Sequence, residues 1–189
     1  MRVSREKFAE NRARILDVAG ALFREKGFDG IGVADIMKAA GLTHGGFYGH
    51  FESKESLACE ASKVLVEKAR DRWQEIVDTA EGDPLEALLR HYLSRRNLQS
   101  QACVFASLTQ EVSRQGARMQ SAFAGGLTDL VDVLADIVVG DTPQARRANA
   151  LATLSAMMGA VILARTMEDA NLADEFLAAT HRQLSRRAA

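Results

Sequence analysis

Residues 39–57 read AAGLTHGGFYGHFESKESL and combine hydrogen-bonding side chains with glycines. Thr43, His44 and Lys54 supply a hydroxyl, an imidazole and an ammonium, all of which can donate hydrogen bonds to phosphate oxygens. The four glycines of this stretch each weaken a helix by roughly 0.5–1 kcal/mol relative to alanine. We therefore expect a partner outside the helix that needs the backbone to come close.

Catalytic chemistry has no comparable set of residues. The chain contains no nucleophile motif, no glycine-rich loop after a strand and no two-histidine spacing on one helix, so we expect no enzyme and no cofactor. Cys59 and Cys103 lie far apart without metal-ligand spacing and are expected to be reduced. Asp129, Asp132 and Asp136 could offer oxygen ligands, but a solvated helix face explains this acidic stripe, and no metal site is predicted.

The composition is that of a globular protein. With 189 residues and 47% hydrophobic content, the chain can build a core in one domain or in a small domain plus a larger one. No apolar stretch approaches the ~20 residues that a membrane span needs, and the first residues lack the pattern of a signal peptide. We expect a cytoplasmic protein with no membrane partner.

The charge is unevenly distributed along the chain. The formal net charge is −1, but residues 1–14 contain five basic side chains (Arg2, Arg5, Lys7, Arg12 and Arg14) and two acidic ones, a local charge of +3. From residue 57 onward, 15 basic and 17 acidic side chains give −2. Any contact with phosphate is therefore expected near the amino terminus.

Apolar residues recur at helical spacing throughout, and no alternating run of β-branched residues predicts a strand. Helices are predicted at about 5–26, in two short pieces within 33–51, and at 54–80, 84–99, 104–113, 116–139, 143–168 and 171–187. The predicted fold class is all-α with about nine helices.

Local residue types mark several helix ends. Gly27 stands where a left-handed residue ends the first helix. Thr43 and Ser53 are predicted to cap the helices that follow them by accepting a backbone N–H. Asp83-Pro84 places proline at the first position of a helix, where its missing N–H costs nothing.

A short helix, a tight turn at Gly41 and a second short helix form the helix-turn-helix pattern. Residues 5 to 60 resemble the DNA-binding domain of the TetR family of bacterial transcriptional regulators. The matching pieces are RARILDVAGALFREKGFDG, VADIMKAAGLTHGGFYGHF and SKESL, in the order and spacing of that family. The resemblance covers the first third of the chain, and CVFASLTQEVSRQ is more weakly similar to the effector domains of some members.

The resemblance implies a helix-turn-helix DNA-binding domain at 1–53 and a helical effector-binding and dimerisation domain at 54–189. It places Thr43, His44, Gly45 and Gly46 at the front of the recognition helix, Tyr48 and His50 at positions that often contact phosphate, and Lys54 beside the DNA backbone. Phe47 and Phe51 occupy positions that pack inward. Ala34 and Gly49 depart from the long polar residues of many members, so direct reading of bases is expected to rest on few side chains.

The penultimate predicted helix has a stripe of small residues that would let another helix approach closely. The resemblance implies that the last two helices pair with their symmetry mates as a four-helix bundle. The predicted interface residues are Ala152, Ser155, Gly159, Ile162, Phe176 and Thr180. The alternative is that both faces belong to the core of a single chain.

Large and polarisable residues of the central helices could line an apolar effector pocket. The candidates are Trp73, His91, Tyr92, Cys103, Phe105, Met119, Phe123 and Met157. Any one of them could equally be ordinary core. Cys103 precedes a predicted helix, whose partial positive charge could make the thiol reactive, although isolated cysteines usually behave as small hydrophobes.

These features predict a ligand-responsive, homodimeric repressor that a small, largely apolar effector releases from a palindromic operator in double-stranded DNA. The alternative is a helical ligand-binding or scaffolding protein that no longer binds DNA.

Overall fold

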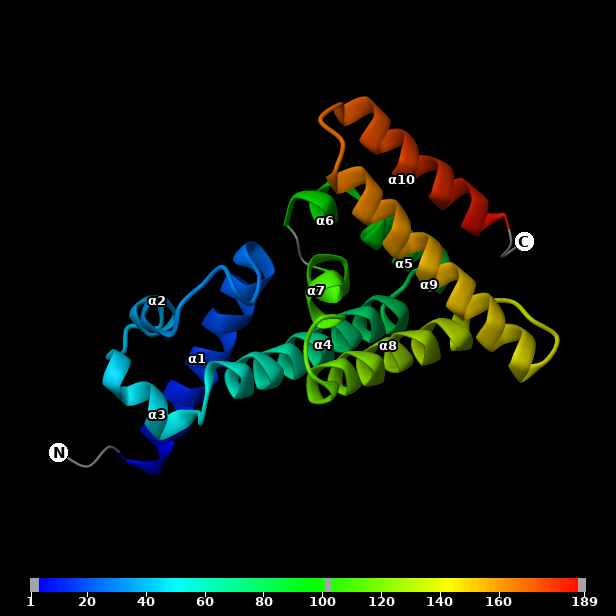
Figure 1. Ribbon diagram of the computed structural model, residues 1–189. Helices are drawn as coiled ribbons and strands as arrows, with labels where there is room; N and C mark the ends of the chain where they lie inside the picture. The colour runs from blue at the N-terminus through cyan, green and yellow to red at the C-terminus, as the bar shows by residue number, and fades with distance from the viewer. Residues whose placement is uncertain (1–3, 101–102, 187–189) are drawn as a thin grey trace. The chain divides into compact units, whose positions relative to one another are not determined.

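The computed structural model describes residues 4–100 and 103–186, and within those ranges every regular element is helical (Figure 1). The elements are α1 (Arg5–Lys26), α2 (Val33–Ala39), the 3-10 helix η1 (His44–Gly46), α3 (Phe47–His50), α4 (Lys54–Asp78), α5 (Pro84–Tyr92), α6 (Arg95–Ser100), α7 (Val104–Val112), α8 (Ala117–Ile137), α9 (Pro143–Arg165) and α10 (Ala170–Ser185). The predicted all-α class is confirmed.

The chain forms two compact units, which are described separately. Unit 1 contains the residues up to Glu67 together with Ser107–Phe123, and unit 2 contains Lys68–Ala106 and the residues from Ala124 onward. The units divide inside α4, α7 and α8, so each of these three helices contributes residues to both. The predicted boundary between residues 53 and 54 divides a DNA-binding part from an effector-binding part and does not coincide with the limits of these compact units. It stays a prediction.

The helix α1 begins and ends at the predicted residues. The Ser4 hydroxyl accepts the N–H of Lys7 at 3.1 Å, and Gly27 follows the last turn with φ +75°. Ile15, Ala19 and Phe23 recur every four residues on one face of α1 and are fully buried. They form the core of unit 1 with side chains such as Ile36, Met37, Phe47 and Leu57.

A carboxylate from α7 holds the turn after α1. The N–H of Phe28 donates to Oε2 of Glu111 at 2.6 Å, and the Phe28 ring packs on Phe23 with centroids 5.3 Å apart. A Cβ atom at Gly27 would collide with the Glu111 carboxylate. Position 27 therefore requires glycine for its positive φ and also for the approach of Glu111.

Unit 2 is built around α9 and α10, which pack along each other, with α5 against α10 (Figure 1). The Thr142 hydroxyl caps α9 by accepting Ala145 N–H at 3.1 Å. Pro84 is the first residue of α5, as predicted, and the Asp83 carboxylate caps the helix by accepting Leu85 N–H at 2.9 Å.

The single helix predicted at 84–99 is two helices, α5 and α6. The chain bends at Leu93, whose ψ of 45° lies outside the helical range. The Ser94 hydroxyl accepts Asn97 N–H at 3.2 Å, and the buried Asn97 amide donates to the Tyr92 carbonyl at 2.7 Å. These side chains replace helical backbone bonds, an alternative that apolar periodicity does not detect.

The helix α9 is long and apolar enough to cross a membrane by length and composition, which corrects the expectation that no stretch approaches that length. A core helix of a soluble protein passes the same test, and 39% of its most apolar window is buried within the protein. The length of α9 by itself is weak evidence for a membrane span.

Candidate nucleic-acid interface and effector unit

The residues that the resemblance assigns to DNA bases lie within residues 43–50, which we call the recognition segment. It consists of η1 and the single turn α3, and Gly41 before it has φ +68°. The Thr43 hydroxyl makes no capping hydrogen bond, because the Thr43 carbonyl accepts Gly46 N–H at 3.0 Å in the 3-10 turn. The predicted side-chain cap at Thr43 is wrong, whereas the Ser53 hydroxyl does accept Ser56 N–H, at 3.1 Å.

Two glycines of the recognition segment face open space. A Cβ atom built at Gly45 or Gly49 would meet no heavy atom within 4 Å, and one at Gly46 would lie 3.6 Å from Oγ1 of Thr43. Internal packing therefore does not require glycine at positions 45 and 49. Missing side chains at these exposed positions leave the backbone open to close approach by a partner, as backbone N–H contacts to phosphate require.

Aromatic rings pack the recognition segment against the rest of unit 1. Phe47 and Phe51 are buried with ring centroids 5.8 Å apart, so their predicted inward packing is confirmed. Tyr48 is 70% exposed and meets the Phe47 ring edge-on at 5.2 Å. The Tyr48 hydroxyl is thus presented to solvent from a fixed ring, in a position to donate to a phosphate.

The imidazole of His50 is engaged with α1. Its ring stacks on Phe8 with centroids 4.1 Å apart, and Nδ1 is buried without a hydrogen-bond partner among the described residues. Burial, and secondly the positive charge of Arg12, lower the pKa of His50 below 6.5. At neutral pH this side chain is uncharged, so any role of His50 toward phosphate would depend on a hydrogen bond alone.

Much of the basic amino-terminal arm is occupied within the protein. Lys7 pairs with Glu10 at 2.8 Å. Arg12 pairs with Glu60 and lies over the Phe51 ring, with Cζ 4.7 Å from the centroid. Arg14 donates to the Ala40 carbonyl at 3.4 Å, at the turn between the short helices. These contacts stabilise the helix-turn-helix, and they leave less charge for DNA than the local +3 predicts; Arg2 lies outside the described residues.

Three other cations of unit 1 are free to contact phosphate. Arg5, Lys38 and Lys54 form no ion pair with the residues that the structure describes. Lys38 lies in the last turn of α2, immediately before the tight turn, and is exposed. The sequence does not single out Lys38, because residue types alone do not show which lysines pair with a carboxylate in the folded protein.

In unit 2, three of the predicted effector residues form one buried cluster. Trp73 and Tyr92 meet edge to face at 5.4 Å, and the Tyr92 hydroxyl lies 2.9 Å from Sγ of Cys103. Burial, and then Cys103, raise the pKa of Tyr92 well above 10.0. Sγ of Cys103 also accepts Ala106 N–H at 3.4 Å at the start of α7. The cluster is buried, and the Tyr92 hydroxyl and the Cys103 thiol already have hydrogen-bond partners.

The other predicted effector residues are scattered. Met119 and Phe123 belong to unit 1, whereas His91, Phe105 and Met157 belong to unit 2. Phe105 and Met157 are buried, and His91 is half-buried with its pKa lowered by burial and then by Arg72 and Arg96. Their role toward an effector stays a prediction, since no ligand is present to test it.

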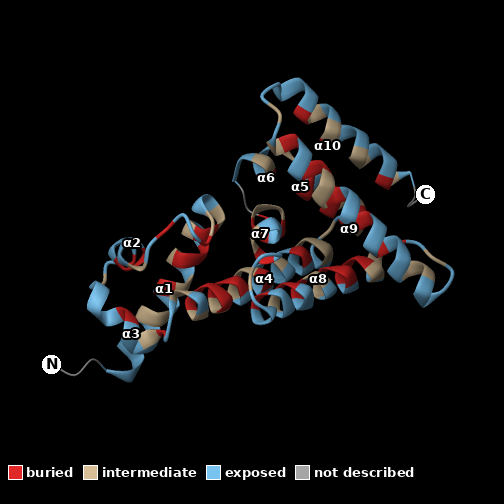
Figure 2. Ribbon diagram, in the orientation of Figure 1, coloured by how far each residue is buried: buried red, intermediate tan, exposed pale blue. Residues whose placement is uncertain are grey.

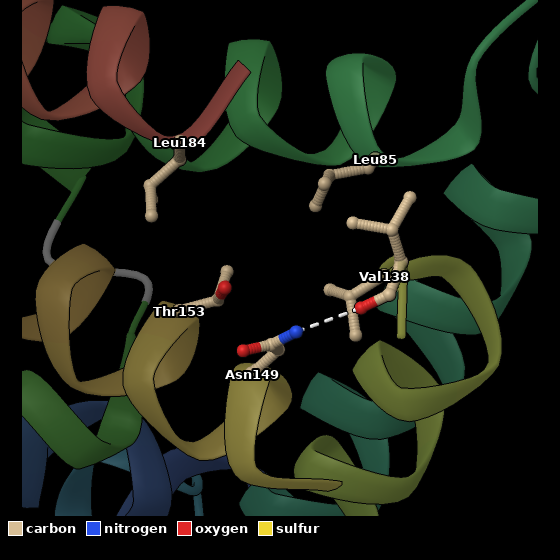
Figure 3. A pocket seen from close by; sticks show the side chains of 6 residues that line it. Leu85, Val138, Asn149, Thr153 and Leu184 are labelled. Carbon is tan, nitrogen blue, oxygen red and sulfur yellow. Dashed lines mark hydrogen bonds between the residues drawn. The ribbon is translucent and has the colours of Figure 1, made fainter. Parts of the chain in front are cut away.

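The cavities lined by described residues of unit 2 include three that none of those eight residues lines. One, of about 280 Å³, lies among α5, α9, α10 and the residues after α8, and is lined by Leu85, Val138, Val139, Asn149, Thr153 and Leu184 (Figure 3). A cavity of about 340 Å³ adjoins Arg95 and Asp174, and a third of about 280 Å³ lies between α8 and α9 near Leu151. Within residues 4–100 and 103–186, no group of three or more His, Cys, Asp or Glu residues could hold a metal ion.

The predicted dimer residues of α9 lie on its outward face. Ala152, Ser155 and Ile162 are exposed, and a Cβ atom at Gly159 would meet nothing within 4 Å. Large apolar side chains share this exposure, since Leu151 is 48% and Leu163 47% exposed. Phe176 and Thr180 on α10 are half-buried. Figure 2 shows the exposed residues along α9 and α10. This surface includes several exposed large apolar side chains, which is typical of a surface that contacts another protein.

A tight glycine turn between short helices, an exposed segment held by buried rings and free cations nearby are the features of a helix-turn-helix region. Residues 15–61 match the family described as "Bacterial regulatory proteins, tetR family". The HTH-type transcriptional repressor KstR2 of Mycolicibacterium smegmatis is 36% identical over 80 residues, 42% of this chain and 38% of that protein. The amino-terminal part of the chain therefore matches the DNA-binding region of the TetR family.

The similarity beyond the DNA-binding region is weaker in sequence than in structure. The HTH-type transcriptional repressor NemR of Escherichia coli K12 is 25% identical over 130 residues, 66% of this chain and 65% of that protein. A TetR transcriptional regulator from Chloroflexus aurantiacus superposes with a TM-score of 0.80 at 25% identity, covering 96% of this chain and 98% of that one. These sequence alignments thus span less than two thirds of the named repressors, whereas the fold extends over nearly the whole chain.

Proposed function

We propose that this protein is a homodimeric, ligand-responsive transcriptional repressor that leaves a palindromic operator when a small molecule binds to unit 2. The observation that carries the proposal is the recognition segment, where Gly45 and Gly49 face open space on a base of buried aromatic rings. Such a segment suits the amino-end-first entry of a short helix into the major groove. KstR2 and NemR are both named repressors, which supports repression rather than activation.

Binding to DNA from the region upstream of the protein's own gene tests this proposal. Fluorescence anisotropy with that DNA and with a scrambled duplex, at several salt concentrations, should show specific binding at least about 1,000-fold tighter than non-specific binding. Equal affinity for both duplexes would contradict the repressor function. It would favour the alternative, a helical ligand-binding or scaffolding protein that no longer binds DNA.

Dimerisation is proposed to use the outward faces of α9 and α10. Ala152, Ser155 and Gly159 are small, and Ile162 adds exposed apolar area at the same face. A two-fold dimer presents two recognition segments, which matches a palindromic operator with half-sites one helical turn apart, about 34–36 Å. Sedimentation at micromolar concentration should show a dimer.

Communication between effector and DNA is proposed to follow the helices that contribute to both units. The units divide inside α4, α7 and α8, so these three helices are the candidates. Of these, α7 makes a specific polar contact with the helix-turn-helix through Glu111 and Phe28. A coupling free energy of about 1–3 kcal/mol would weaken operator binding about 5- to 150-fold when the effector binds.

The matched relatives are named as transcriptional regulators, and proteins of this kind generally have no catalytic activity of their own. We therefore propose regulation by binding alone, in the cytoplasm, where operator DNA is found. Assays for hydrolase or oxidoreductase activity are expected to give no turnover.

A further inference from the structure

The cavity lined by Leu85, Val138 and Leu184 is enclosed on its inner side and open at its mouth. These three side chains and Thr153 are at most 6% exposed, whereas Val139 is 50% exposed and Asn149 is also exposed. Figure 3 shows the side chains of α5, α9 and α10 directed toward one another across the space. A molecule could therefore enter past Val139 and Asn149 and reach a buried apolar floor.

Thr153 is the feature of this cavity that internal packing does not explain. Its hydroxyl has no hydrogen-bond partner among the residues that the structure describes, although Thr153 is only 6% exposed. The oxygen is not among the fully buried polar atoms that lack a partner, so it is accessible from the space of the cavity. Figure 3 shows that the side chain is directed into the cavity, so the missing partner would have to come from there.

Asn149 supplies a second polar group at a fixed orientation. Its Nδ2 donates to the Val139 carbonyl at 2.8 Å, which holds the amide in place and leaves Oδ1 available as an acceptor. Thr153 can therefore donate or accept, and Asn149 can accept. More of the accessible lining of the cavity is polar than apolar, and these polar groups lie beside three apolar side chains.

The size and charge of the cavity restrict its ligand. A volume of about 280 Å³ lies near the lower end of ligand pockets, and corresponds to about nine water volumes at ~30 Å³ each. No charged side chain lines the cavity, so an ionised ligand would lose its hydration without a counter-charge. A compact, neutral molecule with an apolar body and one hydroxyl or amide fits these limits.

We infer that this cavity is a binding site for a small neutral alcohol, phenol or amide, whose polar group pairs with Thr153 and Asn149. In naming that molecule as the effector, the inference rests on the proposed repressor function. It locates the effector away from the buried Trp73–Tyr92–Cys103 cluster, in which the Tyr92 hydroxyl and the Cys103 thiol already pair with each other.

Three probes of similar shape test the site directly on the full chain. Phenol is neutral with a hydroxyl, toluene lacks the hydroxyl, and benzoate is charged. Methyl NMR spectra of protein labelled at Leu, Val and Thr should show saturable shifts of Leu85, Val138 and Leu184 on addition of phenol. Toluene should bind about threefold to tenfold more weakly because it cannot pair with Thr153, and benzoate should not bind.

Variants separate the hydroxyl from the rest of the cavity. Thr153→Val should lower the affinity for phenol to that for toluene while leaving toluene binding and folding unchanged, because the hydroxyl makes no bond within the protein. Thr79→Val is the matched control, since the Thr79 hydroxyl donates to the Glu75 carbonyl on an exposed surface. Val138→Trp should fill the cavity and abolish binding of both probes.

Either of two results would overturn the inference. One is an absence of saturable shifts at Leu85, Val138 and Leu184, and the other is a phenol preference that Thr153→Val leaves intact. Operator binding by the ligand-free protein is measured separately. Its failure would contradict the proposed function, whereas the methyl titration alone decides whether the cavity binds a ligand.

Discussion

The recognition segment and the α9–α10 pair differ in how their side chains are used. The recognition segment has only short helical turns, η1 and α3, and it is fixed by the buried rings of Phe47 and Phe51 and by the stack of His50 on Phe8, while residues 43–46, 48 and 49 are exposed. The pair α9–α10 consists of long helices with buried apolar stripes on one side and exposed apolar residues such as Leu151 and Leu163 on the other.

This difference separates two kinds of contact that serve the same proposed function. A segment that is fixed by a few rings and hydrogen bonds can present a backbone to DNA without a large buried area of its own. Long helices instead stabilise through area, at roughly 25 cal/mol per Å² of apolar surface buried. Substitutions in the two regions should therefore have different effects. Those in the recognition segment should disturb the geometry of DNA contact, whereas those on the α9–α10 pair should weaken association of two chains.

The largest effect is expected at Gly159 on the exposed face of α9. Gly159→Leu places a large side chain where the monomer has open space, so the chain should still fold, but the helix contact of a dimer should be overpacked. Loss of the second half-site should lower operator affinity by about 100-fold or more. Sedimentation and anisotropy measure the two effects.

Gly125→Leu is the matched control for Gly159→Leu. Gly125 also lies within a helix, α8, and a Cβ atom there would meet nothing within 4 Å. This variant should remain dimeric. If Gly159→Leu also stays dimeric at micromolar concentration, the interface lies elsewhere and the contrast between the two regions fails.

A smaller but still clear effect is expected from the polar contact behind the helix-turn-helix. Glu111→Ala should leave the Phe28 N–H without its acceptor and lower the free energy of unfolding by about 1–3 kcal/mol. Glu111→Gln retains an oxygen acceptor and should lose less. Urea denaturation compares the three proteins, and equal losses for Ala and Gln would show that the carboxylate charge, not the hydrogen bond, matters.

Substitutions in and beside the recognition segment should distinguish contacts to bases from contacts to phosphates. His44→Ala should cost about 1–3 kcal/mol on operator DNA and little on scrambled DNA, if His44 contacts a base. Lys54→Ala should weaken both to a similar degree and reduce the salt slope by about one, as loss of one phosphate contact predicts. Equal losses on both duplexes for His44→Ala would remove it from base recognition.

The smallest effect concerns the protonation of His50. Because its pKa in the folded protein lies below 6.5, the unfolded chain binds a proton more readily. The contribution of His50 to stability is therefore complete above about pH 6.5 and is lost as pH falls through the lowered pKa of the folded state. His50→Phe can keep the stack on Phe8 and should reduce this pH dependence, measured by urea unfolding between pH 5 and 8.

If wild type and His50→Phe lose stability equally on acidification, burial of the imidazole does not cause the dependence. His91, whose pKa is also lowered by burial, would then be the group to replace next.

Local sequence was sufficient where the determinant is a neighbour along the chain. The limits of α1, the cap at Ser53, the start of α5 at Pro84 and the turns at Gly27 and Gly41 were all predictable, because each depends on residues within one helical turn. The break between α5 and α6 was not predicted, since it depends on the buried Asn97 amide.

The division of charges was not predictable for the same reason. The charges of residues 1–14 predicted a basic arm. In the structure Arg12 pairs with Glu60, which is distant in the sequence, and Arg14 donates a hydrogen bond to the Ala40 carbonyl. Lys38 and Lys54 are left as the cations beside the recognition segment. Pairing over such distances depends on which helices pack together.

The sequence by itself determined the helical class and the helix-turn-helix with its family resemblance, because periodic apolar residues, caps and turn glycines act over short range. The tertiary structure decided which large residues are core, which exposed and which line a cavity. Tyr92 and Cys103 are closed against each other, whereas Thr153 is directed into empty space, and nothing in their types or spacing distinguishes these outcomes. Burial is a property of the packed helices, and each side chain acquires its environment only when they assemble.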